Sequence, residues 1–97
     1  MSVVGIVATI KVQAGKEAEF EKIFSDLRAK VRANEAGNLQ YDFFKMKDEP
    51  TYVVMEQYAS EQAMAEHGQS EHFKAAGPAL GTVLAGRPAL QIVSKVE

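Results

Sequence analysis

Residues 39–59 read LQYDFFKMKDEPTYVVMEQYA, two runs rich in apolar and aromatic residues on either side of a polar loop. Within 39–46 and within 51–59, every second residue is mostly large and apolar, which is typical of β-strands. Residues 47–50 between them are charged and end in proline, as a hairpin loop does. The stretch therefore predicts two antiparallel strands at the centre of the chain.

An amphipathic helix is predicted before this hairpin, over residues 16–33. Its apolar side chains recur at i, i+3, i+4, i+7 and i+11 and so form one stripe. They are Phe20, Ile23, Phe24, Leu27 and Val31. Residues 34–38 end the helix, and Gly37 suits a left-handed backbone position there. Ahead of the helix, residues 2–12 are rich in Val and Ile on both faces and predict a central strand.

The second half of the chain repeats the order helix and strand. Two helical pieces are predicted, over residues 61–68 and from residue 71 onward, with Ser70 as the N-cap of the second. Helical periodicity continues past Pro78, where we expect a break or kink because proline removes a backbone donor. Residues 89–96 alternate again and predict the last strand.

The resulting order β-α-β-β-α-β predicts a ferredoxin-like α+β fold, an antiparallel sheet with both helical regions on one face. The 97 residues suffice for a single domain over 1–97. Both faces of the strands carry apolar side chains, so the face without helices needs a partner, and we expect a homodimer. The alternation does not settle which strand face meets the helices.

The composition excludes several classes of protein. Lys and Arg number 11 against 13 Asp and Glu, so the chain lacks the basic surface that binds nucleic acid or anionic membranes. It has no cysteine, which excludes disulfides, a thiol nucleophile and cysteine-ligated metals. No targeting segment and no apolar run long enough for a membrane span are visible, so a cytoplasmic location is expected.

Sequence motifs for cofactors are also missing. The chain has no glycine-rich phosphate loop and no Gly-x-Ser-x-Gly nucleophile elbow. Its two histidines are His67 and His72. On one continuous helix a spacing of five would hold them about 140° apart, so the i, i+4 pair that chelates metal is absent. We therefore expect no metal catalysis and no nucleotide cofactor held by a glycine-rich loop.

His67 and Glu56 are the candidate catalytic residues. His67 lies on the apolar side of its helix, as a core histidine bound to a backbone carbonyl or Tyr58, or as a general base in a pocket. Glu56 would be a charge on an apolar strand face, which is costly unless it is paired. It forms an ion pair with an arginine (Arg28, Arg32 or Arg87), or it orients His67 or contacts substrate.

The large apolar side chains are core, dimer interface or the lining of a cavity. A ligand of such a cavity would be apolar or aromatic with one or two polar groups. The candidate substrate-binding residues are Tyr41, Phe44, Tyr58, Met64, His72 and Phe73. A half-exposed surface position suits His72 better than a ligand contact.

Four segments together resemble the antibiotic biosynthesis monooxygenase family. Residues 12–20 (VQAGKEAEF) resemble its strand-to-helix connection, and residues 31–41 (VRANEAGNLQY) contain its Glu-x-Gly turn. The third strand ends in Glu-Gln-Tyr at 56–58, and residues 67–73 carry the most specific pattern, His-x-x-Ser-x-His-Phe.

The resemblance implies a dimeric α+β barrel built from two ferredoxin-like subunits. It implies a monooxygenase that oxidises a quinol or polyphenolic substrate with O₂, without flavin, haem or metal. His67 matches the family's helix histidine, as a base or hydrogen-bond partner, and Glu56 matches its strand glutamate. Tyr58 stands where relatives often have Trp, and the first strand has no Asn, which disfavours haem degradation.

Two other functions stay open. One is a non-catalytic dimer that binds a small ligand, for example in a stress response. The other is an isomerase or degrading enzyme of a small signal molecule, since the family includes one. A phosphorylated signal would need a basic pocket, for which Arg28, Arg32 and Arg87 are the candidates.

Overall fold

The structure, a computed structural model, describes residues 2–96; residues 1 and 97 of the predicted domain lie outside this part. The elements follow the predicted order, with strand ends within two residues of their predicted positions. In chain order they are β1 (Val4–Lys11), α1 (Glu17–Asn34), β2 (Asn38–Lys45), β3 (Thr51–Tyr58), α2 (Glu61–Gln69), α3 (Glu71–Gly81) and β4 (Ala89–Ser94).

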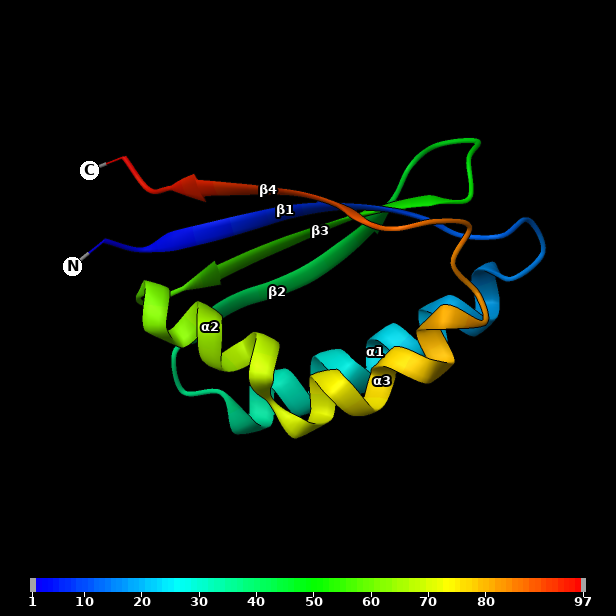
Figure 1. Ribbon diagram of the computed structural model, residues 1–97. Coiled ribbons are helices and arrows are strands. Elements are labelled where there is room, and N and C mark those ends of the chain that lie inside the picture. Colours follow the sequence, from blue (N-terminus) through cyan, green and yellow to red (C-terminus); the bar gives the residue numbers. More distant parts are fainter. Residues whose placement is uncertain (1, 97) are drawn as a thin grey trace.

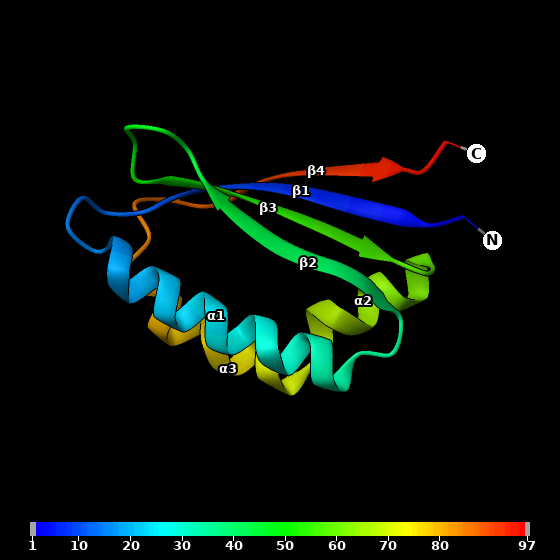
Figure 2. The same ribbon diagram turned by 180° about the vertical axis from the view of Figure 1, so that it is seen from behind.

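The four strands form one sheet in the order β2-β3-β1-β4, and all neighbours are antiparallel. Figures 1 and 2 show from opposite sides that the helices lie against one face of this sheet. The predicted ferredoxin-like α+β fold is confirmed. β1 lies between β3 and β4, as its apolar sequence predicts.

The core lies between α1 and the inner face of the sheet. Tyr52, Val54, Glu56 and Tyr58 of β3 are buried on this face, which settles the alternation that the sequence left open. The predicted stripe of α1 packs onto it, with the rings of Phe20 and Tyr52 4.6 Å apart between centroids. Aromatic contacts of this kind add to the free energy gained from burial.

The break or kink expected at Pro78 is not a break, because α3 runs from Glu71 to Gly81 with Pro78 inside it. A kink there stays a prediction. Proline removes one backbone hydrogen bond from a helix, but it does not remove the apolar contacts of its neighbours. Ala76 and Leu80 pack against the core on either side of Pro78. This packing holds the helix together across the proline.

Gly37, in the turn from α1 to β2, is needed for space. Among residues 2–96 the glycine with a positive φ is Gly15, so the left-handed position predicted for Gly37 is wrong. A Cβ atom at position 37 would lie 2.5 Å from the Cβ of Ala63 in α2. The turn therefore lies directly against α2, which brings the end of α1 close to that helix.

Gly37→Ala is expected to lower the free energy of unfolding by about 1–3 kcal/mol, the usual cost of overpacking. Urea unfolding measures it. Ala63→Gly in the same chain should restore part of the loss, because it removes the atom that clashes. Gly68→Ala is the control, since nothing lies within 4 Å of a Cβ there. A Gly37→Ala protein as stable as the Gly68→Ala protein would contradict the close contact.

The outer face of the sheet carries exposed apolar side chains. Phe44, Met55 and Val93 are 52%, 41% and 48% exposed there. The helices also leave β4 uncovered on the inner side, where Leu90 and Ile92 are 61% and 65% exposed. The single chain therefore leaves apolar surface unburied on both sides of the sheet.

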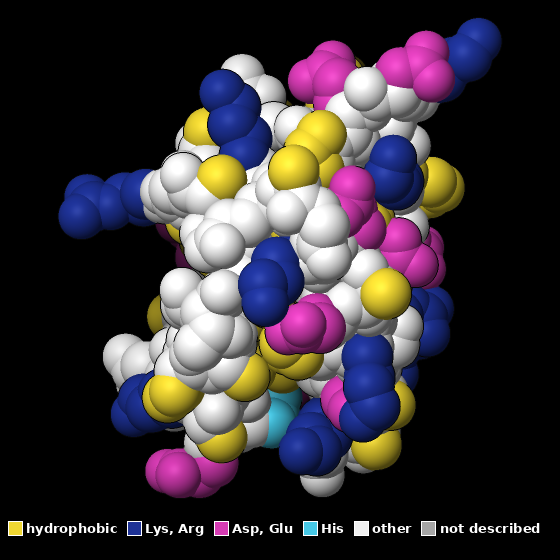
Figure 3. All heavy atoms as spheres, turned by 90° about the vertical axis from the view of Figure 1, so that its right-hand side faces the viewer, with side chains coloured by type: hydrophobic (Ala, Val, Ile, Leu, Met, Phe, Trp, Pro, Cys, Tyr) yellow, Lys and Arg dark blue, Asp and Glu magenta, His cyan; other side chains and the backbone are white. Residues whose placement is uncertain are grey.

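Acidic and basic side chains are interspersed over the end of the molecule seen in Figure 3, as the near balance of charges predicts. Within residues 2–96, no helix combines the length and apolar character needed to span a membrane. The cytoplasmic location stays a prediction.

Candidate functional site

A cavity of about 430 Å³ lies between the inner face of the sheet and the helices. Most of its lining is aliphatic or aromatic, from β1, α1 and α3. Its polar or charged lining residues are Tyr41, Glu56, His67 and Arg87. Cavities of this size and character bind small apolar molecules, and the few polar groups orient them.

His67 lies in the last turn of α2 and is buried, 5% exposed. The rings of Tyr41, Tyr58 and Phe73 surround its imidazole, at centroid distances of 5.2, 5.4 and 4.8 Å. Its Nε2 lies 3.5 Å from the Tyr41 hydroxyl, on the cavity side. The histidine thus faces the sheet, as its position in the helix predicts.

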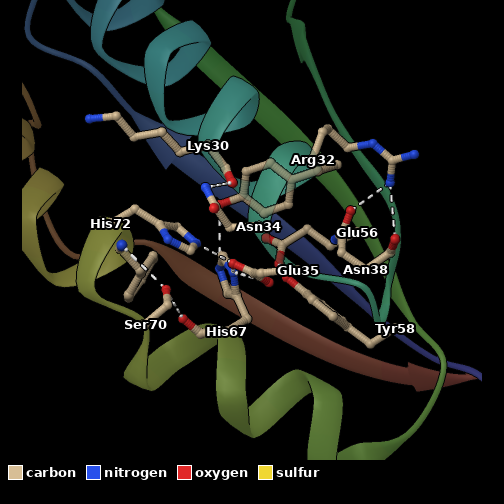
Figure 4. A network of polar contacts seen from close by, with 12 residues as sticks. Lys30, Arg32, Asn34, Glu35, Asn38, Glu56, Tyr58, His67, Ser70 and His72 are labelled. Atoms are coloured by element: carbon tan, nitrogen blue, oxygen red, sulfur yellow. Dashed lines mark hydrogen bonds and ion pairs between the residues drawn. The ribbon is translucent and has the colours of Figure 1, made fainter.

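Glu35 binds the other ring nitrogen of His67. Its two carboxylate oxygens lie 3.0 and 2.9 Å from Nδ1. Figure 4 shows the Glu35 side chain pointing toward the His67 ring. A carboxylate accepts hydrogen bonds, so Nδ1 carries the proton and Nε2 keeps its lone pair toward the cavity. Glu35 is the C-cap of α1, and the turn that contains Gly37 holds it beside α2.

His72 also donates to Glu35, with its Nε2 2.5 Å from Oε2. Ser70 makes this possible, because it ends α2 and caps α3: its hydroxyl donates to the His67 carbonyl and accepts from the Phe73 N–H. The predicted separation of the two histidines by about 140° on one continuous helix is therefore wrong. The two histidines lie on different helices, and both contact one carboxylate.

Glu35, His67 and His72 bring one carboxylate oxygen and two imidazole nitrogens within 4.8 Å of one another. Two histidines and a carboxylate are a donor set that transition metals accept. The three side chains bind one another through the hydrogen bonds described above. Oxygen uptake by EDTA-treated protein, with and without added metal ions, tests whether these three residues also bind a metal.

Glu56 is buried, 8% exposed, and its carboxylate accepts a hydrogen bond of 2.7 Å from the Tyr58 hydroxyl. Burial raises the pKa of Glu56, and the Tyr58 hydrogen bond and the nearby His67 partly oppose this. Burial also raises the pKa of Tyr58 and Tyr41, with the Glu56 charge adding to both shifts. Both phenols therefore stay protonated and donate.

Of the interactions expected for Glu56, neither the ion pair with an arginine nor a hydrogen bond to His67 is formed among the described residues. Its contact with substrate stays a prediction. Arg28 binds Asp42 at 3.0 Å, and Arg32 binds the Asn38 side chain at 2.7 Å. Within residues 2–96 no arginine pairs with Glu56. The carboxylate that orients His67 is Glu35.

Glu56→Gln is expected to stabilise the protein at neutral pH. The raised pKa means that the folded chain binds this proton more tightly than the unfolded chain. Stability therefore falls as pH rises through the folded pKa of Glu56. Glutamine removes the charge and keeps an acceptor for Tyr58.

Urea unfolding between pH 4 and pH 8 measures this effect. The gain over wild type should appear at the upper end of the range and vanish at the lower end. Glu49→Gln, at an exposed loop position, is the control. A Glu56→Gln protein less stable than wild type at pH 8 would show that the charge is favourable there.

Most of the residues predicted for the site lie around this cavity. Tyr41, Met64 and Phe73 line it together with His67 and Glu56. Tyr58 is buried behind Glu56, and His72 reaches Glu35 from outside the cavity. Phe44 is exposed on the opposite face of the sheet. The roles of all these residues stay proposals.

Glu35 was not predicted as a site residue. The sequence indicated only that it belongs to the turn after the first helix. One signal was available. A carboxylate at the C-terminal end of a helix is opposed by the helix dipole, so it needs a partner. Arg87 was considered as an ion-pair partner of Glu56 and as one of three arginines for a basic pocket, and it lines the cavity.

Comparison with known proteins agrees with this architecture. The family profile of antibiotic biosynthesis monooxygenases matches residues 3–79. A protein of Bacillus subtilis (strain 168), named "Putative monooxygenase YcnE", is 41% identical over 68 residues, which cover 69% of this chain and 70% of that protein.

Two solved structures are similar over nearly their whole lengths. One, from Caulobacter crescentus CB15 and described as "a putative antibiotic biosynthesis monooxygenase", has a TM-score of 0.95 and 49% identity, covering 99% of this chain and 92% of that one. PA3566 from Pseudomonas aeruginosa has a TM-score of 0.88 and 23% identity, covering 100% and 97%, and supports the fold alone. With the profile matching most of its length, the chain belongs to the antibiotic biosynthesis monooxygenase family.

Proposed function

We propose that the chain is a cofactor-independent monooxygenase that oxidises a quinol or a polyphenolic aromatic substrate with O₂. Membership of the family supports a monooxygenase. The observation that carries the proposal is His67, whose Nε2 lies at an apolar cavity while Nδ1 is bound to Glu35. An apolar cavity can hold the aromatic rings of a substrate, and a histidine with an unprotonated Nε2 can accept the proton of its hydroxyl group.

The first step is removal of a proton from the substrate hydroxyl. The O–H bond breaks, the proton goes to Nε2 of His67, and the electron pair stays on the substrate oxygen. Glu35 stabilises the imidazolium that forms, because its carboxylate already contacts Nδ1. The protonated Tyr41 phenol, 3.5 Å from Nε2, would donate to the substrate oxyanion.

The substrate is then its own reductant. Its anion passes an electron to O₂, and the two radicals combine to form a C–O bond. The peroxide takes back the proton from His67 and becomes a hydroperoxide. The C–H bond at the carbon that bears it then breaks, and its electron pair forms the C=O bond as the O–O bond breaks. The hydroxide that leaves takes up the proton of that C–H bond and departs as water. One oxygen atom ends in the quinone product and one in water. All four electrons come from the substrate, so the balance needs no other redox partner.

Glu56 lies on the same wall as His67 and would accept a hydrogen bond from a second hydroxyl of the substrate. Its partner Tyr58 already donates to one of its oxygens, Oε1. Contact with substrate is one of the two functional roles that the sequence left open for Glu56; the other, orientation of His67, falls to Glu35. Positioning of this kind contributes to the rate by holding the reacting atoms in place.

We also propose a homodimer whose two sheets stack through their outer faces. The exposed Phe44, Met55 and Val93 on that face support it, since burying apolar surface is favourable. Sedimentation equilibrium should give twice the mass of the 10.6 kDa chain. The mass of a single chain at micromolar concentration would contradict the dimer.

Oxygen consumption tests the reaction. A panel of quinols and anthrones is assayed with EDTA-treated protein in an oxygen electrode, with autoxidation subtracted, and again after addition of Zn²⁺, Mn²⁺ or Fe²⁺. Stimulated uptake by the EDTA-treated protein is expected. Uptake only after addition of a metal would contradict the cofactor-free reaction. Ligand binding with no uptake across the panel would favour a non-catalytic binding protein.

The isomerase of a phosphorylated signal has less support. Such a ligand needs several cations in the cavity. Arg28 and Arg32 bind Asp42 and Asn38 instead, and of the three candidate arginines Arg87 lines the cavity. One arginine beside many apolar side chains favours the aromatic substrate.

A further inference from the structure

Arg87 lines the cavity from the segment between α3 and β4, far along the sheet from His67. The residues of β1 measure how far apart Glu56 and Arg87 lie along the sheet. Ile6 lies opposite Glu56, at the His67 end, while Thr9 lies opposite Ala89, two residues after Arg87. The Ala85 N–H donates to the carbonyl of Lys11.

Arg87 therefore leaves the backbone three to five residues along β1 from the level of Glu56. At about 3.4 Å per residue this is roughly 10–17 Å. The arginine side chain spans part of this length. A fused aromatic ring system, with one substituent at each end, spans the rest.

The charges of the cavity are separated in the same way. Its acidic lining residue, Glu56, lies at the His67 end, and its cationic lining residue, Arg87, lies at the other. In the part of the chain that the structure describes, Arg87 has no ion pair, whereas Arg28 and Arg32 are held by Asp42 and Asn38. The guanidinium at this end is therefore open to a ligand.

We propose that Arg87 is a binding site for a carboxylate on the substrate, at the end opposite the hydroxyl that reaches His67. A guanidinium presents its N–H groups in the fork that matches a carboxylate. The substrate is then a hydroxylated aromatic acid, apolar in the middle, with its anionic group at the mouth of the cavity. The placement of the substrate hydroxyl at His67 rests on the proposed function, whereas the placement of the carboxylate at Arg87 does not.

The test compares two fluorescent ligands that differ by one group, 6-hydroxy-2-naphthoate and 2-naphthol. Binding to the full chain is followed by fluorescence titration in the absence of oxygen, so turnover plays no part. Wild type should bind the naphthoate about 10-fold more tightly, the lower range for a charge-assisted hydrogen bond at an exposed group.

Two variants test whether Arg87 causes the preference for the naphthoate over 2-naphthol. Arg87→Gln should lose it, with the affinity for 2-naphthol unchanged, and Arg87→Lys should keep part of it. Arg28→Gln is the matched control, because Arg28 binds Asp42 outside the cavity. Arg87 is exposed, so its variants should fold, and thermal unfolding checks this.

Three results would overturn the proposal: equal affinity of wild type for both ligands, a preference that survives in Arg87→Gln, or no binding of either ligand at millimolar concentration. The outcome is separate from that of the proposed function. A naphthoate preference that depends on Arg87, in a protein without oxygen uptake, would leave the carboxylate site standing while the monooxygenase reaction falls.

Discussion

Glu35→Ala is expected to lower the free energy of unfolding by about 2–5 kcal/mol, because it leaves the buried imidazole of His67 and the partly buried imidazole of His72 without their acceptor. The side chains of His67 and His72 are only 6% and 14% exposed, so water does not replace the carboxylate at full strength. The variant should also lose activity, since the tautomer of His67 is no longer fixed. Urea unfolding followed by circular dichroism measures the stability.

Glu66→Ala is the matched control for this substitution. Glu66 is exposed on α2 and contacts Gln62, so its loss should change stability by no more than about 0.5 kcal/mol. Glu35→Gln should lie between the two, because the amide oxygen still accepts from one histidine. If Glu35→Ala proves as stable as Glu66→Ala, the three side chains do not form the network described here.

His67→Ala is expected to reduce oxygen uptake by about 10²–10⁴-fold, the range that general base catalysis contributes. The cavity and its aromatic walls remain, so affinity for the aromatic body of the substrate should change little. Initial rates with the best substrate of the panel, corrected for autoxidation, measure the effect. His67→Gln serves as a second variant that better fills the space.

His72→Ala is the comparison variant, since it removes the other imidazole on Glu35 without changing the lining of the cavity. Its rate should fall far less than that of His67→Ala. Equal rates for wild type and His67→Ala would remove His67 as the base.

The order of elements could be predicted because each depends on a local pattern. Two such patterns depend only on residues a few positions apart in the sequence. They are the apolar stripe of α1, from Phe20 to Val31, and the alternation in β3 of Tyr52, Val54, Glu56 and Tyr58. The inward position of His67 follows from the same periodicity. The continuation of α3 past Pro78 was not predictable from local pattern, because packing of Ala76 and Leu80 against the core is not a local property.

The partner of His67 could not be predicted from local pattern. Glu35 lies 32 residues away in the chain, and its contact depends on how closely the Gly37 turn approaches α2. Glu56 matches the strand glutamate of the family and lies on the inner face of the sheet. The sequence therefore favoured Glu56 over Glu35 as the carboxylate that orients His67. His67 and His72 contact the same carboxylate because α2 ends and α3 begins at Ser70. Their spacing along one continuous helix could not predict this contact.

In the proposed reaction the chain itself, without a cofactor, inserts one oxygen atom from O₂ into an aromatic substrate. Incubation of the EDTA-treated protein with the active quinol under ¹⁸O₂, followed by mass spectrometry of the quinone, tests it most directly. The proposed reaction predicts one ¹⁸O atom per product molecule, formed by wild type above the autoxidation background and lost in His67→Ala. Product without ¹⁸O, or labelled product formed equally by both proteins, would contradict it.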